Sequence, residues 1–171
     1  MILYPIGASG ETLILTRPVL EKFEAFRQRR WQQREAGGQL FARFVDRHIV
    51  VEEATGPNKG DVRSRYAFRP NRRREQRDIL KRYARGLHFV GDWHTHPERL
   101  PRISARDHES MRELVSQSKH GLNGFVLVIA GTGDGPAALS VSVFDRTSYS
   151  ILNASRWSPA ACPDDLCHNG A

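Results

Sequence analysis

The chain has 171 residues, of which 39% are hydrophobic and 26% charged, as expected of a single globular domain with a sizeable core. No apolar run approaches the roughly 18–20 residues that a membrane span needs, and the first residues lack the basic start and cleavage site of a secretory signal. The two cysteines cannot form a disulfide framework, so we expect a cytoplasmic location.

The net charge of +7 is concentrated in one stretch. Residues 69–85 hold eight basic and two acidic side chains, which is +6 within 17 residues. Such a stripe either binds an acidic partner, protein or nucleic acid, or is a solvated helix face. Because the arginines do not alternate with aromatic side chains that stack bases, we expect no specific nucleic-acid binding.

The first predicted helix begins at residues 16–18, where Thr-Arg-Pro offers a cap and a proline for the first turn. A short strand is expected before it, at 12–15. We expect the helix to reach Arg34, with Trp31 as a candidate for its buried face. The two glycines at 37–38 should stop it and allow a close approach of chains.

Residues 39–45 and 48–54 are predicted to be the strands of a hairpin with a tight turn between them. Glycine, proline and asparagine then indicate a loop at 55–64, followed by a short strand at 65–69. The basic stretch is predicted to be a helix at 71–85, which lies on the surface because its apolar side is thin.

The second half of the chain is expected to complete one α/β domain at residues 1–155. Its run at 124–130 is apolar and rich in β-branched residues, which indicates a buried central strand. The other expected elements are a strand at 88–96, a helix from Ser104 to about residue 118, and strands at 137–144 and 149–152. We therefore predict a mixed, mostly antiparallel sheet flanked by helices, with a flexible tail at 156–171.

The residues best suited to chemistry lie between positions 88 and 107. His94 and His96 are two apart on a predicted strand, so their side chains point the same way. Ser104 is a good helix N-cap, which places Asp107 in the first turn of the following helix. Two imidazoles and a carboxylate can hold one zinc ion and leave a fourth position open for water, as catalytic zinc sites do.

The spacing of these residues resembles the signature of the JAMM (JAB1/MPN/Mov34) metallopeptidases. That signature is His-x-His, seven residues, Ser, two residues and Asp, and it matches here at His94, His96, Ser104 and Asp107. The family also carries an upstream glutamate before small residues, and Glu35 fits that pattern. The chain looks most like the prokaryotic JAB branch, in particular the deconjugating peptidases of bacterial ubiquitin-like conjugation operons. Some of those anti-phage operons are built around a cGAS-like nucleotidyltransferase.

The resemblance implies a single JAB/MPN domain of the cytidine-deaminase-like fold and a zinc-dependent isopeptidase. Zn²⁺ would be held by His94, His96 and Asp107, while Glu35 would take a proton from water and return it to the leaving amine. Ser104 would cap its helix, donate a hydrogen bond to the oxyanion, or do both.

The implied substrate is a ubiquitin-like conjugate, such as a conjugated cGAS-like nucleotidyltransferase whose release would regulate an anti-phage system. The basic helix would then bind an acidic surface of the target. Two alternatives are the processing of a ubiquitin-like precursor and a non-catalytic MPN scaffold.

Several other residues near the motif or in the tail have alternative interpretations. Asp92 should face the same side as the two histidines, where it either orients one of them or is an exposed carboxylate. Trp93 and Thr95 should face the opposite side, with Trp93 in the core. The tail also carries Cys162, Cys167 and His168, which supply only three donors and are not expected to form a zinc site.

Overall fold

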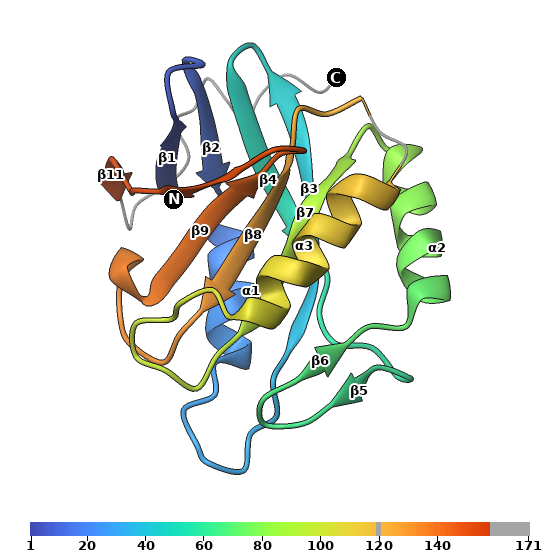
Figure 1. The fold of residues 1–171 in the computed structure, drawn as a ribbon, viewed down its shortest axis with the longest axis vertical. Coiled ribbons are helices and arrows are strands. Elements are labelled where there is room, and N and C mark those ends of the chain that lie inside the picture. Colours follow the sequence, from blue (N-terminus) through green and yellow to red (C-terminus); the bar gives the residue numbers. More distant parts are fainter. Residues whose placement is uncertain (119–120, 158–171) are drawn as a thin grey trace.

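The computed structural model describes residues 1–118 and 121–157 (Figure 1). The strands are β1 (Ile2–Ile6), β2 (Glu11–Leu15), β3 (Gly37–Val45), β4 (His48–Ala54), β5 (Val62–Arg63), β6 (Phe68–Arg69), β7 (His88–Thr95), β8 (Phe125–Ala130), β9 (Leu139–Phe144), β10 (Tyr149–Leu152) and β11 (Arg156–Trp157). The helices are α1 (Arg17–Phe26), α2 (Arg72–Tyr83) and α3 (Ala105–Gln117), with a short 3₁₀ turn at Pro136–Ala138.

Nine of these strands form one sheet in the order β10-β9-β8-β7-β3-β4-β2-β1-β11, and β5 and β6 form a separate small hairpin. Within the large sheet, β2 is parallel to β4 and β7 is parallel to β8, whereas the other neighbours are antiparallel. The predicted α/β class and the mixed, mostly antiparallel sheet are therefore confirmed.

The helices cover the two faces of the sheet, with α1 behind it and α2 and α3 in front (Figure 1). Strand β8 separates the two resulting cores because its side chains alternate between them. Val126 and Val128 belong to the core that includes Phe23 of α1, whereas Leu127 packs in the core of α3. All six residues of β8 are buried, which explains why its sequence is continuously apolar.

Strand β7 leads from the core to the motif. Trp93 is 1% exposed, and its ring lies 4.8 Å from that of Phe23 in α1. Its indole Nε1 donates a hydrogen bond of 2.8 Å to the carbonyl oxygen of Thr55. Thr95 is also fully buried, so the predicted orientation of both residues is confirmed. The side chain of His94, which lies between them, consequently faces the opposite side of the sheet.

The first helix is shorter than predicted, because α1 ends at Phe26 rather than at Arg34. Arg27 follows the helix, and its buried guanidinium donates hydrogen bonds to the carbonyl oxygens of Gly131 and Gly133. These two residues lie more than 100 positions later in the sequence. Residues 27–36 are then irregular, and Trp31 is 74% exposed, so its expected burial was wrong.

The glycines at 37 and 38 begin β3 instead of stopping a helix. The expected close approach is confirmed: a Cβ on Gly37 would lie 2.7 Å from the ring of Phe68, and one on Gly38 would lie 2.5 Å from the carbonyl oxygen of Thr55. Glu35 therefore lies in the irregular segment that leads into β3, not at a helix end.

Both ends of the described chain differ from the prediction. Strand β1 was not predicted, and Ile2 pairs with Trp157 of β11 at one edge of the sheet. The sheet thus runs two residues into the expected tail, and Cys162, Cys167 and His168 lie outside the described residues. The predicted strand at 65–69 shrinks to Phe68–Arg69. Among the described helices, none combines the length and apolarity needed to cross a membrane.

Candidate metal centre

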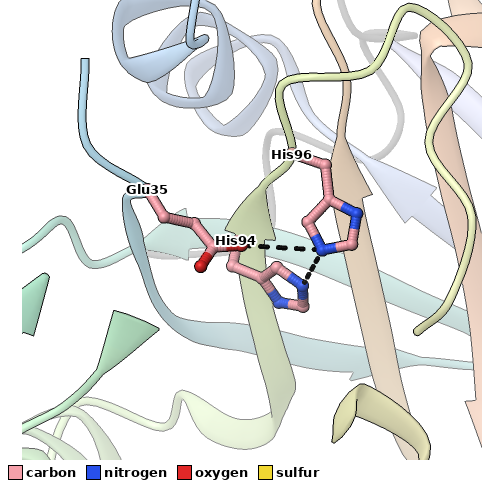
Figure 2. A group of neighbouring side chains, drawn as sticks. All are labelled: Glu35, His94 and His96. Atoms are coloured by element: carbon pink, nitrogen blue, oxygen red, sulfur yellow. Dashed lines mark hydrogen bonds and ion pairs between the residues drawn. The ribbon is translucent and has the colours of Figure 1, made fainter. Parts of the chain in front are cut away.

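The side chain of Glu35 and those of His94 and His96, which come from two distant segments of the chain, point toward one another at the end of β7 (Figure 2). The Nε2 atoms of His94 and His96 are 3.1 Å apart, and Nε2 of His96 lies 3.5 Å from Oε1 of Glu35. Their potential ligand atoms all lie within 4.8 Å of one another. Imidazole nitrogens and carboxylate oxygens at such distances suit a zinc ion, so these residues could hold a metal.

Asp107 of α3 reaches the same point from the other side. Its Oδ1 is 3.2 Å from Nε2 of His94, and its Oδ2 is 3.5 Å from Nε2 of His96. All three side chains are only 12–13% exposed, at the edge of a cavity of about 500 Å³. The structure therefore brings together the three residues that the sequence predicts as zinc ligands.

Ser104 fixes the position of Asp107 through a capping box. The backbone N–H of Asp107 donates to Ser104 Oγ at 3.2 Å, while Asp107 Oδ2 accepts from the backbone N–H and the hydroxyl of Ser104 at 2.8 and 2.6 Å. The predicted cap is confirmed. Ser104 is exposed and lines the same cavity as the two histidines and Asp107.

The carboxylates of the centre have opposite pKa shifts. Burial raises the pKa of Glu35 to about 7; the charge of His94 opposes this shift and that of Asp107 adds to it. Burial also acts to raise the pKa of Asp107, but the hydrogen bond and charge of His94 and the bonds from Ser104 hold it well below its usual value. Glu35 can thus exchange a proton near neutral pH while Asp107 stays charged.

The electrostatics of His96 also favour metal binding. Burial lowers the pKa of its imidazole, and the neighbouring charge of His94 lowers it further. A metal-ligating histidine must be neutral, so the protein holds His96 in the form that a metal requires.

The backbone around Glu35 is tied to two other segments. Its N–H donates to the carbonyl oxygen of Ser64 at 2.7 Å, and its carbonyl oxygen accepts from Arg63 Nε at 2.6 Å. The next residue, Ala36, donates to Thr95 Oγ1 at 3.0 Å and accepts from the Thr95 N–H at 2.8 Å. Since Thr95 lies between the two histidines, these bonds set the position of Glu35 relative to them.

Gln28 is a further residue of this framework, and sequence reasoning missed it. It is 3% exposed, its Oε1 accepts from the Thr95 hydroxyl at 3.0 Å, and its Nε2 donates to the carbonyl oxygen of Arg65 at 2.8 Å. It therefore joins β7 to the loop before β6. No sequence signal marked it, because it was assigned to a helix that the structure ends two residues earlier.

We expect Gln28→Leu to destabilise the protein by about 1–3 kcal/mol, because the buried hydroxyl of Thr95 and carbonyl of Arg65 lose their partner. Denaturant unfolding measures this change. Gln32→Leu, at an exposed position on the same segment, is the matched control and should stay within about 0.5 kcal/mol of the wild type. Equal effects of the two variants would refute the role of Gln28.

Neither expected alternative for Asp92 holds. Its Oδ1 is shielded from solvent and has no hydrogen-bond partner among the described residues, so it is not an exposed carboxylate. No hydrogen bond joins it to either histidine in the described structure. Burial, with an addition from the nearby Glu75, raises its pKa to about 7.

Ion pairs within the fold occupy about half of the basic residues in α2 and just beyond its C-terminal end. Arg82 and Arg85 pair with Glu53 of β4 at 2.8 and 2.6 Å. Arg72 and Arg74 pair with acidic residues of their own helix. Three exposed cations of α2 have no ion pair within the described part of the chain, and their spacing of four places them on one helix face. We call them the basic row: Arg73, Arg77 and Lys81.

Comparison with known proteins adds independent findings. A family model described as prokaryotic homologs of the JAB domain matches residues 16–146. A CD-NTase/cGAS isopeptidase of Escherichia coli is 26% identical over 101 residues, which cover 57% of this chain and 65% of that protein. A CD-NTase/cGAS isopeptidase of Vibrio cholerae is 28% identical over 125 residues, which cover 71% of this chain and 78% of that protein.

Solved structures show the same fold. The solution structure of a Desulfitobacterium hafniense protein superposes with a TM-score of 0.57 at 20% identity, over 81% of this chain and 88% of that one. At this identity the likeness concerns the fold alone.

Proposed function

Because the chain belongs to the prokaryotic JAB-domain family of JAMM-type peptidases, we propose that it is a zinc-dependent isopeptidase that releases proteins from ubiquitin-like conjugates. The family that the sequence predicted is confirmed by the family model and by the relatives named as isopeptidases. The metal, the roles of the residues and the substrate are parts of the proposal.

The observation that carries the proposal is the convergence of Glu35, His94, His96 and Asp107 on one point. Zinc, when bound, supplies a Lewis acid that makes water nucleophilic near neutral pH. His94, His96 and Asp107 would hold the ion. The Glu35 carboxylate, with a pKa of about 7, would accept the proton of the attacking water and return it to the leaving amine.

The relatives suggest the substrate. Two of them are named CD-NTase/cGAS isopeptidases, so we propose that this chain cuts the bond joining a cGAS-like nucleotidyltransferase to its conjugation target. Cleavage of this bond would release the nucleotidyltransferase and so regulate a bacterial anti-phage conjugation system. The matched region spans less than two thirds of the E. coli relative, which makes the substrate a matter for direct test.

The test is to present the zinc-loaded protein with two substrates of identical sequence and to follow both by intact mass. In one, the carboxyl terminus of the nucleotidyltransferase is joined to a lysine ε-amine; in the other, the same carboxyl group continues as a linear peptide. We expect the isopeptide to be cut faster. A preference for the linear bond would instead indicate precursor processing, and no cleavage of either would indicate a non-catalytic scaffold.

Ser104→Ala separates the two roles of the Ser104 hydroxyl. If the hydroxyl stabilises the oxyanion, kcat should fall roughly 10²- to 10³-fold, whereas the lost cap should cost only about 1 kcal/mol of stability. Steady-state kinetics and thermal unfolding of the same sample measure both effects. Ser116→Ala, on an exposed turn of the same helix, is the control and should change neither. A stability loss with normal kcat would leave the hydroxyl only its cap role.

The basic row is proposed to bind an acidic surface of the conjugated protein. Arg77→Glu should lower kcat/KM for a protein conjugate roughly 2- to 10-fold at low salt, because it reverses an exposed charge in the row. The effect should shrink as salt rises and be absent with a short peptide substrate. Arg146→Glu makes the same charge change on the turn between β9 and β10. If both variants lose activity equally, the row has no special role.

A further inference from the structure

A second cavity, of about 1060 Å³, opens beside the metal centre between α2, α3 and the sheet. We call it the α2–α3 groove. The two helices that form its walls lie in front of the sheet (Figure 1). It adjoins the cavity of the metal centre, since five residues line both: Arg72, Glu75, Asp92, Glu113 and Leu114. A chain bound at the metal centre can therefore extend directly into the groove.

The floor of the groove carries two polar side chains that each have one buried oxygen without a hydrogen-bond partner in the described structure. Gln39 of β3 and Asp92 of β7 are directly opposite each other in the antiparallel ladder, so they share one face of the sheet. Gln39 is 3% exposed, yet its Oε1 accepts no hydrogen bond, and the same holds for the shielded Oδ1 of Asp92. Buried acceptors without a donor are costly, which points to a ligand that donates hydrogen bonds.

The walls of the groove add negative charge to this floor. Glu75 of α2 and Glu113 of α3 line it together with Asp92, and Arg72 is the one lysine or arginine among the described lining residues. Arg72 is 72% exposed and pairs with Glu75 at 3.1 Å. The groove thus holds three carboxyl groups against one exposed guanidinium, and a bound cation would favour the charged form of these carboxyl groups.

We propose that Asp92 and Gln39, with Glu75 and Glu113, form a pocket that binds a cationic side chain of the substrate, a lysine ammonium or an arginine guanidinium. This inference rests on the proposed isopeptidase function. Such a side chain brings several N–H donors to the unpartnered oxygens, and its aliphatic stem can pack on Phe89, which also lines the groove.

A metal ion does not suit this pocket. Hard cations need several oxygen ligands close together. Within the described residues, the acidic and histidine side chains with metal-ligand spacing are those of the metal centre, around His94 and His96. The acidic residues of the groove are not part of it, so an organic cation with spread donors fits better than an ion.

The position of the pocket fixes which substrate residue it contacts. Asp92 precedes His94 by two residues on β7, which is roughly 6.6 Å along a strand. An extended peptide advances by roughly 3.3 Å per residue, so this distance corresponds to about two residues of a bound substrate. The cationic side chain therefore belongs to a residue about two or three positions from the bond that is cut.

The test uses a set of conjugates that differ at one position, with lysine, arginine or the neutral lysine isostere norleucine at each of the four residues on either side of the cut. At one position two or three residues from the cut, norleucine should raise KM at least about 10-fold while kcat changes less. Asp92→Asn should lose this preference, and Asp92→Glu should keep part of it. Glu21→Gln, on the exposed side of α1, should behave like the wild type.

A binding measurement keeps the inference testable apart from catalysis. Butylguanidinium added to the wild type should shift the NMR signals of the Gln39 side-chain amide, and Asp92→Asn should abolish that shift. Cleavage without any preference for a cation, or a preference that Asp92→Asn leaves intact, would overturn the pocket and leave the isopeptidase function standing. Absent cleavage with the butylguanidinium shift present would overturn the function and keep the pocket as a cation site.

Discussion

Glu35→Gln is expected to lower kcat by about 10²- to 10⁴-fold while the protein stays folded and binds metal. Glutamine has the same shape as glutamate but cannot accept a proton. The side chain is 7% exposed and its pKa is about 7, so it is poised for proton transfer near neutral pH. Single-turnover cleavage of an isopeptide conjugate measures the loss. A decrease of less than about tenfold would exclude Glu35 as the base.

The same variant has a predicted effect on stability that serves as its folding control. The pKa of Glu35 rises from 4.5 to about 7 on folding, so the folded state binds the proton more tightly than the unfolded state. The free energy of unfolding of the metal-free wild type should therefore decrease as the pH rises from about 4.5 to 7. Glu35→Gln should lack this pH dependence. Its free energy of unfolding, compared with that of the wild type at the same pH, should therefore be larger at pH 8 than at pH 5. A pH dependence identical to that of the wild type would contradict the burial of a titrating carboxyl group.

Asp107→Asn is expected to weaken zinc binding by at least about 100-fold, and activity should fall with it. Residues that only orient a metal ligand typically contribute about 10- to 100-fold, and a charged ligand contributes more. Asparagine keeps an oxygen that can accept the hydrogen bonds from Ser104, so the start of α3 should remain in place.

Competition with a chromophoric chelator measures the affinity change of Asp107→Asn. Asp134→Asn, whose side chain is 93% exposed, is the matched control and should bind zinc as the wild type does. Unchanged zinc affinity in Asp107→Asn would remove this residue from the ligand set and leave Glu35, His94 and His96 as the alternative.

Local patterns made part of the metal centre predictable. The alternation along β7 places His94 on one face and Trp93 and Thr95 on the other, and this alternation needs no knowledge of the rest of the chain. The same holds for the cap of α3, since Ser104 and Asp107 are three residues apart and bond to each other. These features follow from strand and helix geometry, which sequence spacing determines directly.

Features that depend on distant partners were not predictable. The helix pattern continues beyond Phe26, but Arg27 turns away to reach Gly131 and Gly133, more than a hundred residues later. Gln28 likewise acquires its role from Thr95, 67 residues away. Such bonds form only when the sheet brings the segments together, and periodicity within one segment carries no information about them.

The charge that the basic stretch offers to a partner also depends on a distant residue. Counting residues predicts a net charge of +6 for this stretch, but Glu53 of β4 lies beside the end of α2 and pairs with Arg82 and Arg85. What remains for a partner is the narrower basic row. Asp92 was placed on the correct face by alternation, whereas its shielding depends on how α2 and α3 cover the sheet.

The most direct test of a single metal working with Glu35 is a zinc titration of metal-free protein while cleavage of one isopeptide conjugate is followed. Activity should rise linearly and reach its plateau at one zinc per chain. Glu35→Gln should bind the same single zinc and stay inactive. Cleavage by the metal-free wild type, or by zinc-loaded Glu35→Gln at the wild-type rate, would contradict the mechanism proposed for this centre.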